Sequence, residues 1–127
     1  MAIIFTVNLR RNYFVSKYEG RISYAEALDK WKNFLEGKEW VPGQNEFVDL
    51  SKAQLNEVTV EDLMNLASYI EDIYIKNSIE KIKVAVYAPN DLPFGIARMY
   101  SAYADESPEL VHVFRDKEEA IRWLLTE

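Results

Sequence analysis

The sequence contains no cysteine and only one histidine. Disulfides, thiolate metal ligands and cysteine nucleophiles are therefore excluded, and one imidazole is too few for a histidine-rich metal site. Four glycines and four prolines are too few for a collagen-like or linker-dominated chain. The longest apolar runs fall far short of the ~20 residues that a membrane-spanning helix needs. We expect a soluble protein with no membrane span.

Positive charge is also scarce, because 15 Lys and Arg residues stand against 21 Asp and Glu residues and leave a net charge of −6. Phosphate backbones repel an anionic domain unless its basic residues gather on one face, and no such cluster is visible, so we expect no nucleic-acid partner. Residues 1–9 lack the basic leader and the small-residue cleavage site of a secretory signal. A cytoplasmic location is expected.

The 127 residues are 49% hydrophobic, 13% aromatic and 28% charged. This length fits one compact domain, spanning residues 1–127, because domains cluster near ~100–150 residues. The apolar content can offset the loss of chain entropy that keeps polar sequences disordered. A hydrophobic core is therefore expected, although composition alone does not indicate a function.

Five segments have the composition of β-strands. Residues 3–9 and 13–19 are β-rich and flank a polar break, which predicts a hairpin. The β-branched run 82–88 is the most hydrophobic of the chain and is typical of an interior strand buried on both faces. The other two predicted strands cover residues 46–51 and 110–114.

Four segments have helical patterns. Ser23 and Glu26 have the spacing of a capping box, and the helix that they begin is expected to end near Gly37. A second helix starts at Thr59, with acidic residues in its first turn where the helix dipole favours negative charge. A third is expected over residues 93–104, and a fourth follows the cap Asp116. The inward stripe of the second helix is predicted to be Leu63, Leu66, Ala67, Ile70 and Tyr74.

The resulting element order is ββαβαβαβα. Strands alternating with helices imply right-handed crossovers and a mostly parallel sheet with helices packed on it. The opening hairpin adds an antiparallel strand, which is expected at an edge. The predicted fold class is therefore α/β, with a five-stranded mixed sheet and four helices.

Three segments together form a recognisable pattern. The hairpin leads into Tyr18-Glu19-Gly20-Arg21-Ile22, a later strand reads Phe47-Val48-Asp49-Leu50-Ser51, and residues 113–124 run from Val-Phe through an acidic cap to Glu-Ala and Trp-Leu. This pattern covers most of the chain and resembles the SpoIIAA-like branch of the STAS domain superfamily. The resemblance implies a five-stranded sheet flanked by four helices, in agreement with the element order.

The resemblance also implies a site on the second helix. STAS domains that antagonise anti-sigma factors carry a phosphorylatable Ser or Thr near the start of the helix after the third strand, usually preceded by Asp and often followed by Ser-Gly. Counting from Asp49 without gaps, that position falls on Thr59. Val58 replaces the Asp, and residues 60–62 bring two carboxylates beside any phosphate. Thr59 is thus a candidate for phosphorylation or for a plain helix cap.

A second implication of the resemblance is a ligand pocket, because the SpoIIAA-like branch is similar in fold to CRAL-TRIO lipid-binding domains. Phe94, Met99, Tyr100 and Tyr103 lie in the third helix and its approach, where Gly95 loosens the helical pattern. They could close an apolar pocket or meet a partner. They could also belong to the core, as most aromatic residues at helical spacing do.

His112 is the only candidate for an imidazole base. In its strand it points opposite to Val111 and Val113, and neither a Gly-x-Ser-x-Gly elbow nor a Ser-x-x-Lys motif accompanies it. A structural role is therefore favoured over catalysis, and a pH-sensitive contact is the alternative.

Polar residues follow the carboxyl ends of the predicted strands, where open α/β sheets bind ligands. These residues are Asp49, Ser51, Asn90, Asp91, Arg115 and Asp116. Caps and turns account for Asp91 and Asp116, so a Mg²⁺ site is not favoured. The four glycines are isolated and form no phosphate-binding loop. We expect no metal and no cofactor.

The sequence thus predicts a non-enzymatic regulatory module that binds another protein or forms a homodimer, as the resemblance to anti-sigma factor antagonists implies. Its interaction surface would be Ser51, Asn56, Thr59 and Asp62. A binding domain for a small apolar molecule or lipid is the alternative. An enzyme that uses the polar strand ends is a third interpretation, which no nucleophile–base pair supports.

Overall fold

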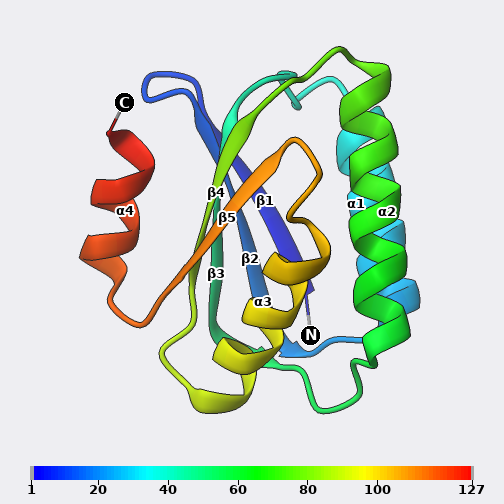
Figure 1. Cartoon of the computed structure of the whole chain (residues 1–127), viewed down its shortest axis with the longest axis vertical. Helices are drawn as coiled ribbons and strands as arrows, with labels where there is room; N and C mark the ends of the chain where they lie inside the picture. The colour runs from blue at the N-terminus through cyan, green and yellow to red at the C-terminus, as the bar shows by residue number, and fades with distance from the viewer. Residues whose placement is uncertain (1, 127) are drawn as a thin grey trace.

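The computed structural model describes residues 2–126 and contains five strands and four helices (Figure 1). In chain order the elements are β1 (Ala2–Asn8), β2 (Tyr13–Arg21), α1 (Tyr24–Glu36), β3 (Asn45–Gln54), α2 (Val60–Lys76), β4 (Ile82–Tyr87), α3 (Asp91–Tyr103), β5 (Glu109–Phe114) and α4 (Lys117–Leu125). Within residues 2–126, no helix combines the length and the apolar content needed to cross a membrane.

The five strands form one sheet in the order β1-β2-β3-β4-β5. β1 pairs antiparallel with β2, and the pairs from β2 to β5 are parallel. The first strand of the hairpin therefore lies at an edge, and the predicted α/β class and element order are confirmed. Helices α1, α2 and α3 cover one face of the sheet, while α4 covers the other (Figure 1).

Each face of the sheet has its own apolar core. Under the three helices, Phe5 stacks on Phe34 with ring centroids 4.2 Å apart, and Trp31 meets Phe5 edge-on at 4.9 Å. The loop residue Trp40 is also buried and stacks on Tyr74 of α2 at 6.0 Å. The smaller core under α4 is formed by Phe47, Ala85, Ala120 and Leu124. Because both faces are covered, β4 is buried on both sides, as its sequence predicts.

Side-chain caps begin the helices at predicted positions. Ser23 Oγ accepts a hydrogen bond from the N–H of Glu26 at 3.3 Å. Asp116 Oδ2 accepts one from the N–H of Glu119 at 2.9 Å. Each cap satisfies a backbone donor that has no partner within the first turn.

β3 is longer than the sequence predicts, because the predicted strand ended at Ser51 and the observed one continues to Gln54. A β-bulge explains the difference. The register against β2 shifts after Asp49, so that two residues of β3 lie opposite Tyr18. Asp49 Oδ1 supports the bulge by accepting hydrogen bonds from the N–H and the hydroxyl of Ser51, at 2.9 and 2.7 Å. The bulge interrupts the alternation from which the strand was predicted.

Other boundaries differ from the prediction by one or two residues, among them the starts of α3 and β5. α3 begins at Asp91 rather than Pro93, and Pro93 is tolerated in its first turn because an N–H there would have no intrahelical partner. β5 begins at Glu109 rather than Leu110. Because β5 begins at Glu109, this buried glutamate is part of the sheet.

Candidate functional site

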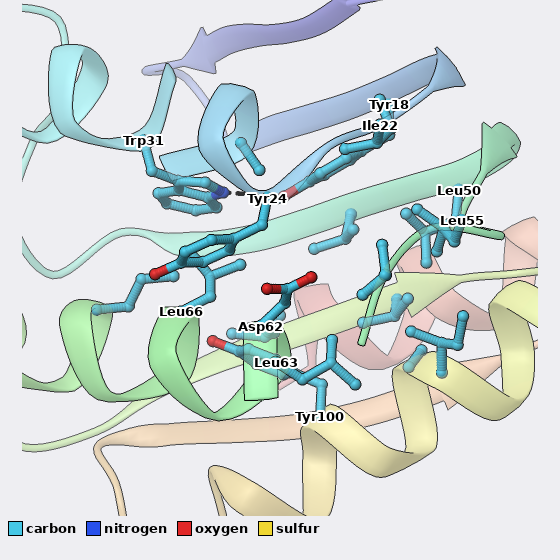
Figure 2. A pocket seen from close by; sticks show the side chains of 18 of the residues that line it. Tyr18, Ile22, Tyr24, Trp31, Leu50, Leu55, Asp62, Leu63, Leu66 and Tyr100 are labelled. Atoms are coloured by element: carbon cyan, nitrogen blue, oxygen red, sulfur yellow. Dashed lines mark hydrogen bonds between the residues drawn. The ribbon is translucent and has the colours of Figure 1, made fainter. Parts of the chain in front are cut away.

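A cavity of about 120 Å³ lies between the sheet and the helices α1, α2 and α3 (Figure 2). The sheet forms one wall and the three helices form the others. From the strands it is lined mainly by Tyr18, Glu46, Val48, Leu50, Val84, Val86 and Glu109. From the helices it is lined mainly by Ala27, Trp31, Leu63, Leu66, Ile70, Ile96, Ala97 and Tyr100.

The cavity opens at the end of the sheet where the parallel strands finish. Ser23 and Tyr24 at the start of α1, and Asp62 at the start of α2, line it and are partly exposed. Trp31 and Tyr100 lie further along their helices, toward the inner end (Figure 2). Open α/β sheets bind ligands at this carboxyl end of their strands, so the opening lies where a ligand is expected to enter.

Most of the cavity wall is aliphatic. Leu50, Leu63, Ile70 and Val86 are all buried lining residues. Cavities with such walls stay dry, and one of ~150 Å³ lined by similar residues binds benzene. The volume here suits a molecule of about that size, and the opening leaves room for a substituent.

Two carboxyl groups line the inner end of the cavity. Glu46 near the start of β3 is 2% exposed, and Glu109 at the start of β5 is 4% exposed. Ser16 Oγ donates a hydrogen bond to Glu46 Oε2 at 2.6 Å, and Tyr100 Oη donates one to Glu109 Oε1 at 2.8 Å. Across residues 2–126, neither carboxyl group forms an ion pair.

Burial keeps both carboxyl groups protonated to an unusually high pH. It raises the pKa of Glu46 from 4.5 to about 8, with a further rise from the charge of Glu109 and a partial offset from the hydrogen bond of Ser16. Burial also raises the pKa of Glu109 from 4.5 to about 7, against the hydrogen bond of Tyr100, and the charge of Glu71 adds to the rise. Both groups therefore titrate near neutral pH.

Buried tyrosines surround these carboxyl groups. Tyr18 Oη accepts a hydrogen bond from Trp31 Nε1 at 2.9 Å, drawn as a dashed line in Figure 2. The hydroxyl of Tyr74 is buried and has no hydrogen-bond partner in the part of the chain that the structure describes. Burial, followed by the charges of Glu46 and Glu109, raises the pKa of Tyr74 well above 10. Tyr74 thus lies within electrostatic reach of both glutamates.

Comparison with known proteins identifies the fold that forms this site. No protein-family model matches the chain, and no curated protein matches it in sequence. A solved structure does match: an uncharacterised protein of the DUF3478 family with a SpoIIAA-like fold, from Shewanella loihica PV-4. The two chains are 19% identical and superpose with a TM-score of 0.55 over 97% of this chain and 92% of that one. This chain has a SpoIIAA-like fold. The resemblance seen in the sequence is therefore confirmed for the fold.

In this SpoIIAA-like fold, Thr59 and Asp62 form the capping box of α2. Thr59 Oγ1 accepts a hydrogen bond from the N–H of Asp62 at 3.1 Å, and Asp62 Oδ2 accepts one from the N–H of Thr59 at 3.0 Å. Asn56 is exposed just before α2, Ser51 lies in the bulge of β3, and Asp62 also lines the cavity. The structure brings the four predicted interaction residues to one end of the sheet. Their contact role, and phosphorylation of Thr59, stay predictions.

The pocket residues predicted in α3 lie away from the cavity. Phe94 is partly buried, whereas Met99 and Tyr103 are each 38% exposed. Because a helix turns once every 3.6 residues, a different stripe of α3 faces the sheet and α2. The cavity is lined instead by Ile96, Ala97 and Tyr100. Phe94 lines a separate hollow between α3 and β5, and a ligand-binding role of Phe94, Met99 and Tyr103 stays a prediction.

The polar residues at the strand ends bind one another. Arg115 Nη1 donates to Asp91 Oδ1 at 2.8 Å and to the Pro89 carbonyl at 3.2 Å, and its guanidinium lies 4.2 Å from the centre of the Phe94 ring. These contacts connect the loop after β4 to the loop after β5. Within residues 2–126, no cluster of three His, Asp or Glu side chains could hold a metal ion.

His112 lies on the opposite face of the sheet from the cavity. Its ring stacks on Trp123 of α4 with centroids 4.4 Å apart and an angle of 12° between the planes. The side chain is exposed and does not line the cavity. This packing accounts for His112 as a structural residue, in line with the sequence interpretation.

The sequence analysis missed Glu46 and Glu109. Glu46 alternates with Val48 and Leu50, so the period of two already placed its carboxyl group on the inward face of β3. Glu109 alternates with Val111 in the same way. A charged residue at an inward position of an interior strand was the available signal, because buried carboxyl groups are rare outside functional sites and ion pairs.

Proposed function

We propose that this protein binds a small, largely apolar molecule in the cavity between the sheet and α1, α2 and α3, without converting it chemically. The cavity itself carries the proposal, because about 120 Å³ of apolar-walled space opens at the carboxyl end of the strands. Protein interiors are otherwise packed as densely as organic crystals, and an unfilled cavity lowers stability. Retention of this space in a domain of 127 residues supports a ligand.

Binding without catalysis is supported by the positions of the hydroxyl groups. Ser16 donates a hydrogen bond to Glu46 at 2.6 Å, but Ser16 is 0% exposed and does not line the cavity. Ser23 does line the cavity, but its oxygen accepts the capping hydrogen bond from Glu26. A ligand would therefore meet no activated nucleophile.

Benzene is a suitable probe, because its size matches the cavity and it has no polar group. We expect ligand-observed NMR to show saturable binding of benzene to the wild-type protein with a millimolar or lower Kd. Ala97→Leu should abolish binding, because Ala97 lines the cavity and is 6% exposed, so that a larger side chain would fill the space. Equal binding by both proteins, or by neither, would contradict the proposal.

Protein binding at the start of α2 is the second candidate, in keeping with the anti-sigma factor antagonist-like role. Two exposed apolar side chains favour it: Val60 is 48% exposed and Met64 is 51% exposed, one helical turn apart and next to Thr59. A partner, either another protein or a second copy, should be retained on immobilised wild-type protein and lost with Met64→Glu. Retention by both proteins would contradict this candidate.

For either candidate we propose that the protein acts in the cytoplasm and binds no nucleic acid. The net charge of −6 supports the second point, because it repels phosphate backbones. Cell fractionation and a binding assay with mixed DNA and RNA test the two statements.

A further inference from the structure

The inner end of the cavity is more polar than an apolar ligand requires. Glu46 and Glu109 line it and are almost fully buried, at 2% and 4% exposure. Each accepts one side-chain hydrogen bond, on Oε2 of Glu46 and on Oε1 of Glu109. The second oxygen of each group receives none from residues 2–126. Removing carboxyl groups from water without a counter-ion lowers stability, so their presence needs an explanation.

Among residues 2–126, no cation compensates these groups. The groups that face them are Tyr18 from β2, Tyr74 and Glu71 from α2, and Tyr100 from α3, none of which carries positive charge. Lys83 lies on the intervening strand β4 but points to the opposite face. Its Nζ donates to the Trp123 carbonyl at 3.0 Å and lies 5.1 Å from the centre of the Trp123 ring. The inner end therefore holds two carboxyl groups that can become negatively charged, and none of residues 2–126 supplies a counter-ion there.

The neighbouring aromatic groups also favour a positively charged ligand. Trp31, Tyr18 and Tyr100 line the cavity beside the carboxyl groups. Aromatic faces attract ammonium groups, and the attraction is stronger where water is excluded. Carboxylates, phenols and an indole around one end of an apolar space form a suitable environment for a protonated amine.

We infer that the ligand of this cavity is a small primary amine, with its ammonium group beside Glu46 and Glu109 and its apolar body against the aliphatic walls. This inference rests on the proposed function and adds the chemical class of the ligand. A neutral ligand would offer no compensating charge when the two carboxyl groups ionise, and an anionic ligand would be repelled by their ionised forms. The ammonium group supplies hydrogen-bond donors to the carboxyl oxygens that line the cavity.

Binding of an amine should change the protonation of Glu46 and Glu109. Around neutral pH, Glu109 is partly ionised and Glu46 largely protonated, because their pKa values are raised to about 7 and about 8. An ammonium ion favours the ionised form of each group. Binding of the amine should therefore release protons between about pH 6 and pH 8, whereas binding of a neutral molecule should release none.

A matched pair of probes tests the inference: cyclopentylamine and methylcyclopentane, which have the same number of non-hydrogen atoms. We expect calorimetry at neutral pH to show that the amine binds at least about tenfold more tightly, the effect of one hydrogen bond to a charged group. Repeating the titration in buffers of different ionisation enthalpy should show proton release for the amine alone. If methylcyclopentane binds and the amine binds no better, the inference fails while the proposed function stands. If neither binds, both fail.

Glu46→Gln and Glu109→Gln locate the amine. Each keeps the shape of the side chain and removes its charge, so we expect the affinity for cyclopentylamine to fall about tenfold and that for methylcyclopentane to stay the same. Glu118→Gln, exposed on α4 across the sheet, should change neither affinity. Amine binding that is unchanged in both cavity variants would overturn the inference. Proton release by the wild-type protein gives a second measurement if either variant folds poorly.

Discussion

Tyr100 on α3 donates a hydrogen bond from its hydroxyl to Glu109 Oε1 at 2.8 Å, where β5 begins. The bond favours the ionised form of Glu109 and so opposes the effect of burial on its pKa, which settles at about 7. Glu46, in the same cavity, has its pKa raised to about 8. The charge at the inner end of the cavity therefore changes across the physiological pH range.

Folding stability should fall as the pH rises from about 5 to about 8. The folded-state pKa values of Glu46 and Glu109, about 8 and about 7, lie above the unfolded value of 4.5, so the folded protein binds more protons between these limits. Stability then decreases by up to ~1.4 kcal/mol per pH unit and group, on the order of 6 kcal/mol in total. Urea denaturation at the two pH values measures the difference.

Glu46→Gln separates this effect from general charge repulsion. The variant keeps an acceptor for Ser16 but cannot ionise, so it should exceed the wild-type stability at pH 8 by on the order of 3 kcal/mol and differ little at pH 5. Glu118→Gln, on the surface of α4, should show no such dependence on pH. Equal stability of the wild-type protein at both pH values would refute the prediction.

Tyr100→Phe should destabilise the protein and raise the pKa of Glu109 further, because it removes the one side-chain donor to that carboxyl group among residues 2–126. The loss of unfolding free energy should be about 1 kcal/mol at pH 5 and about 2 kcal/mol above pH 7, where the acceptor is charged. Urea denaturation and carboxyl ¹³C shifts measure the two effects. Tyr103→Phe, at a partly exposed tyrosine of the same helix, is the control and should change stability by less than about 0.5 kcal/mol. A Glu109 pKa unaffected by the change would be inconsistent with the observed hydrogen bond.

Most of the fold could be predicted from local patterns. Alternating and β-branched runs located all five strands, and the caps Ser23, Thr59 and Asp116 located three helix starts. The end of β3 could not be predicted in this way. Its bulge depends on a hydrogen bond of Asp49 and on pairing with β2, and non-local pairing leaves no local pattern.

The site was harder to predict than the fold. The sequence placed ligands at the carboxyl ends of the strands, and the mouth of the cavity does lie there, between Tyr24 and Asp62. Its inner end depends on Glu46, Tyr100 and Glu109, which come from β3, α3 and β5. Their meeting follows from sheet order and helix packing, which one sequence does not specify. The inward position of Glu46 could be predicted from the sequence, but the residues that surround its carboxyl group could not.

Thr59→Ala should destabilise the protein by about 1 kcal/mol, because it removes the acceptor for the N–H of Asp62 at the start of α2. Thr59→Ser keeps the hydroxyl and should retain most of the stability. Thermal unfolding of the two variants measures the difference. If both unfold at the wild-type temperature, the capping box contributes no stability and the helix-cap interpretation of Thr59 fails.

Ala97→Leu and Ala120→Leu should differ in their effect on stability, although both alanines are buried in helices. Ala97 lines the cavity, so the added methyl groups can occupy empty space, and stability should change by less than about 1 kcal/mol. Ala120 is 0% exposed in the core under α4 and does not line the cavity, so the same change should overpack that core and cost about 1–3 kcal/mol. Urea denaturation compares the two directly. Equal destabilisation would mean that the space beside Ala97 is filled in solution, and the cavity could then hold no ligand.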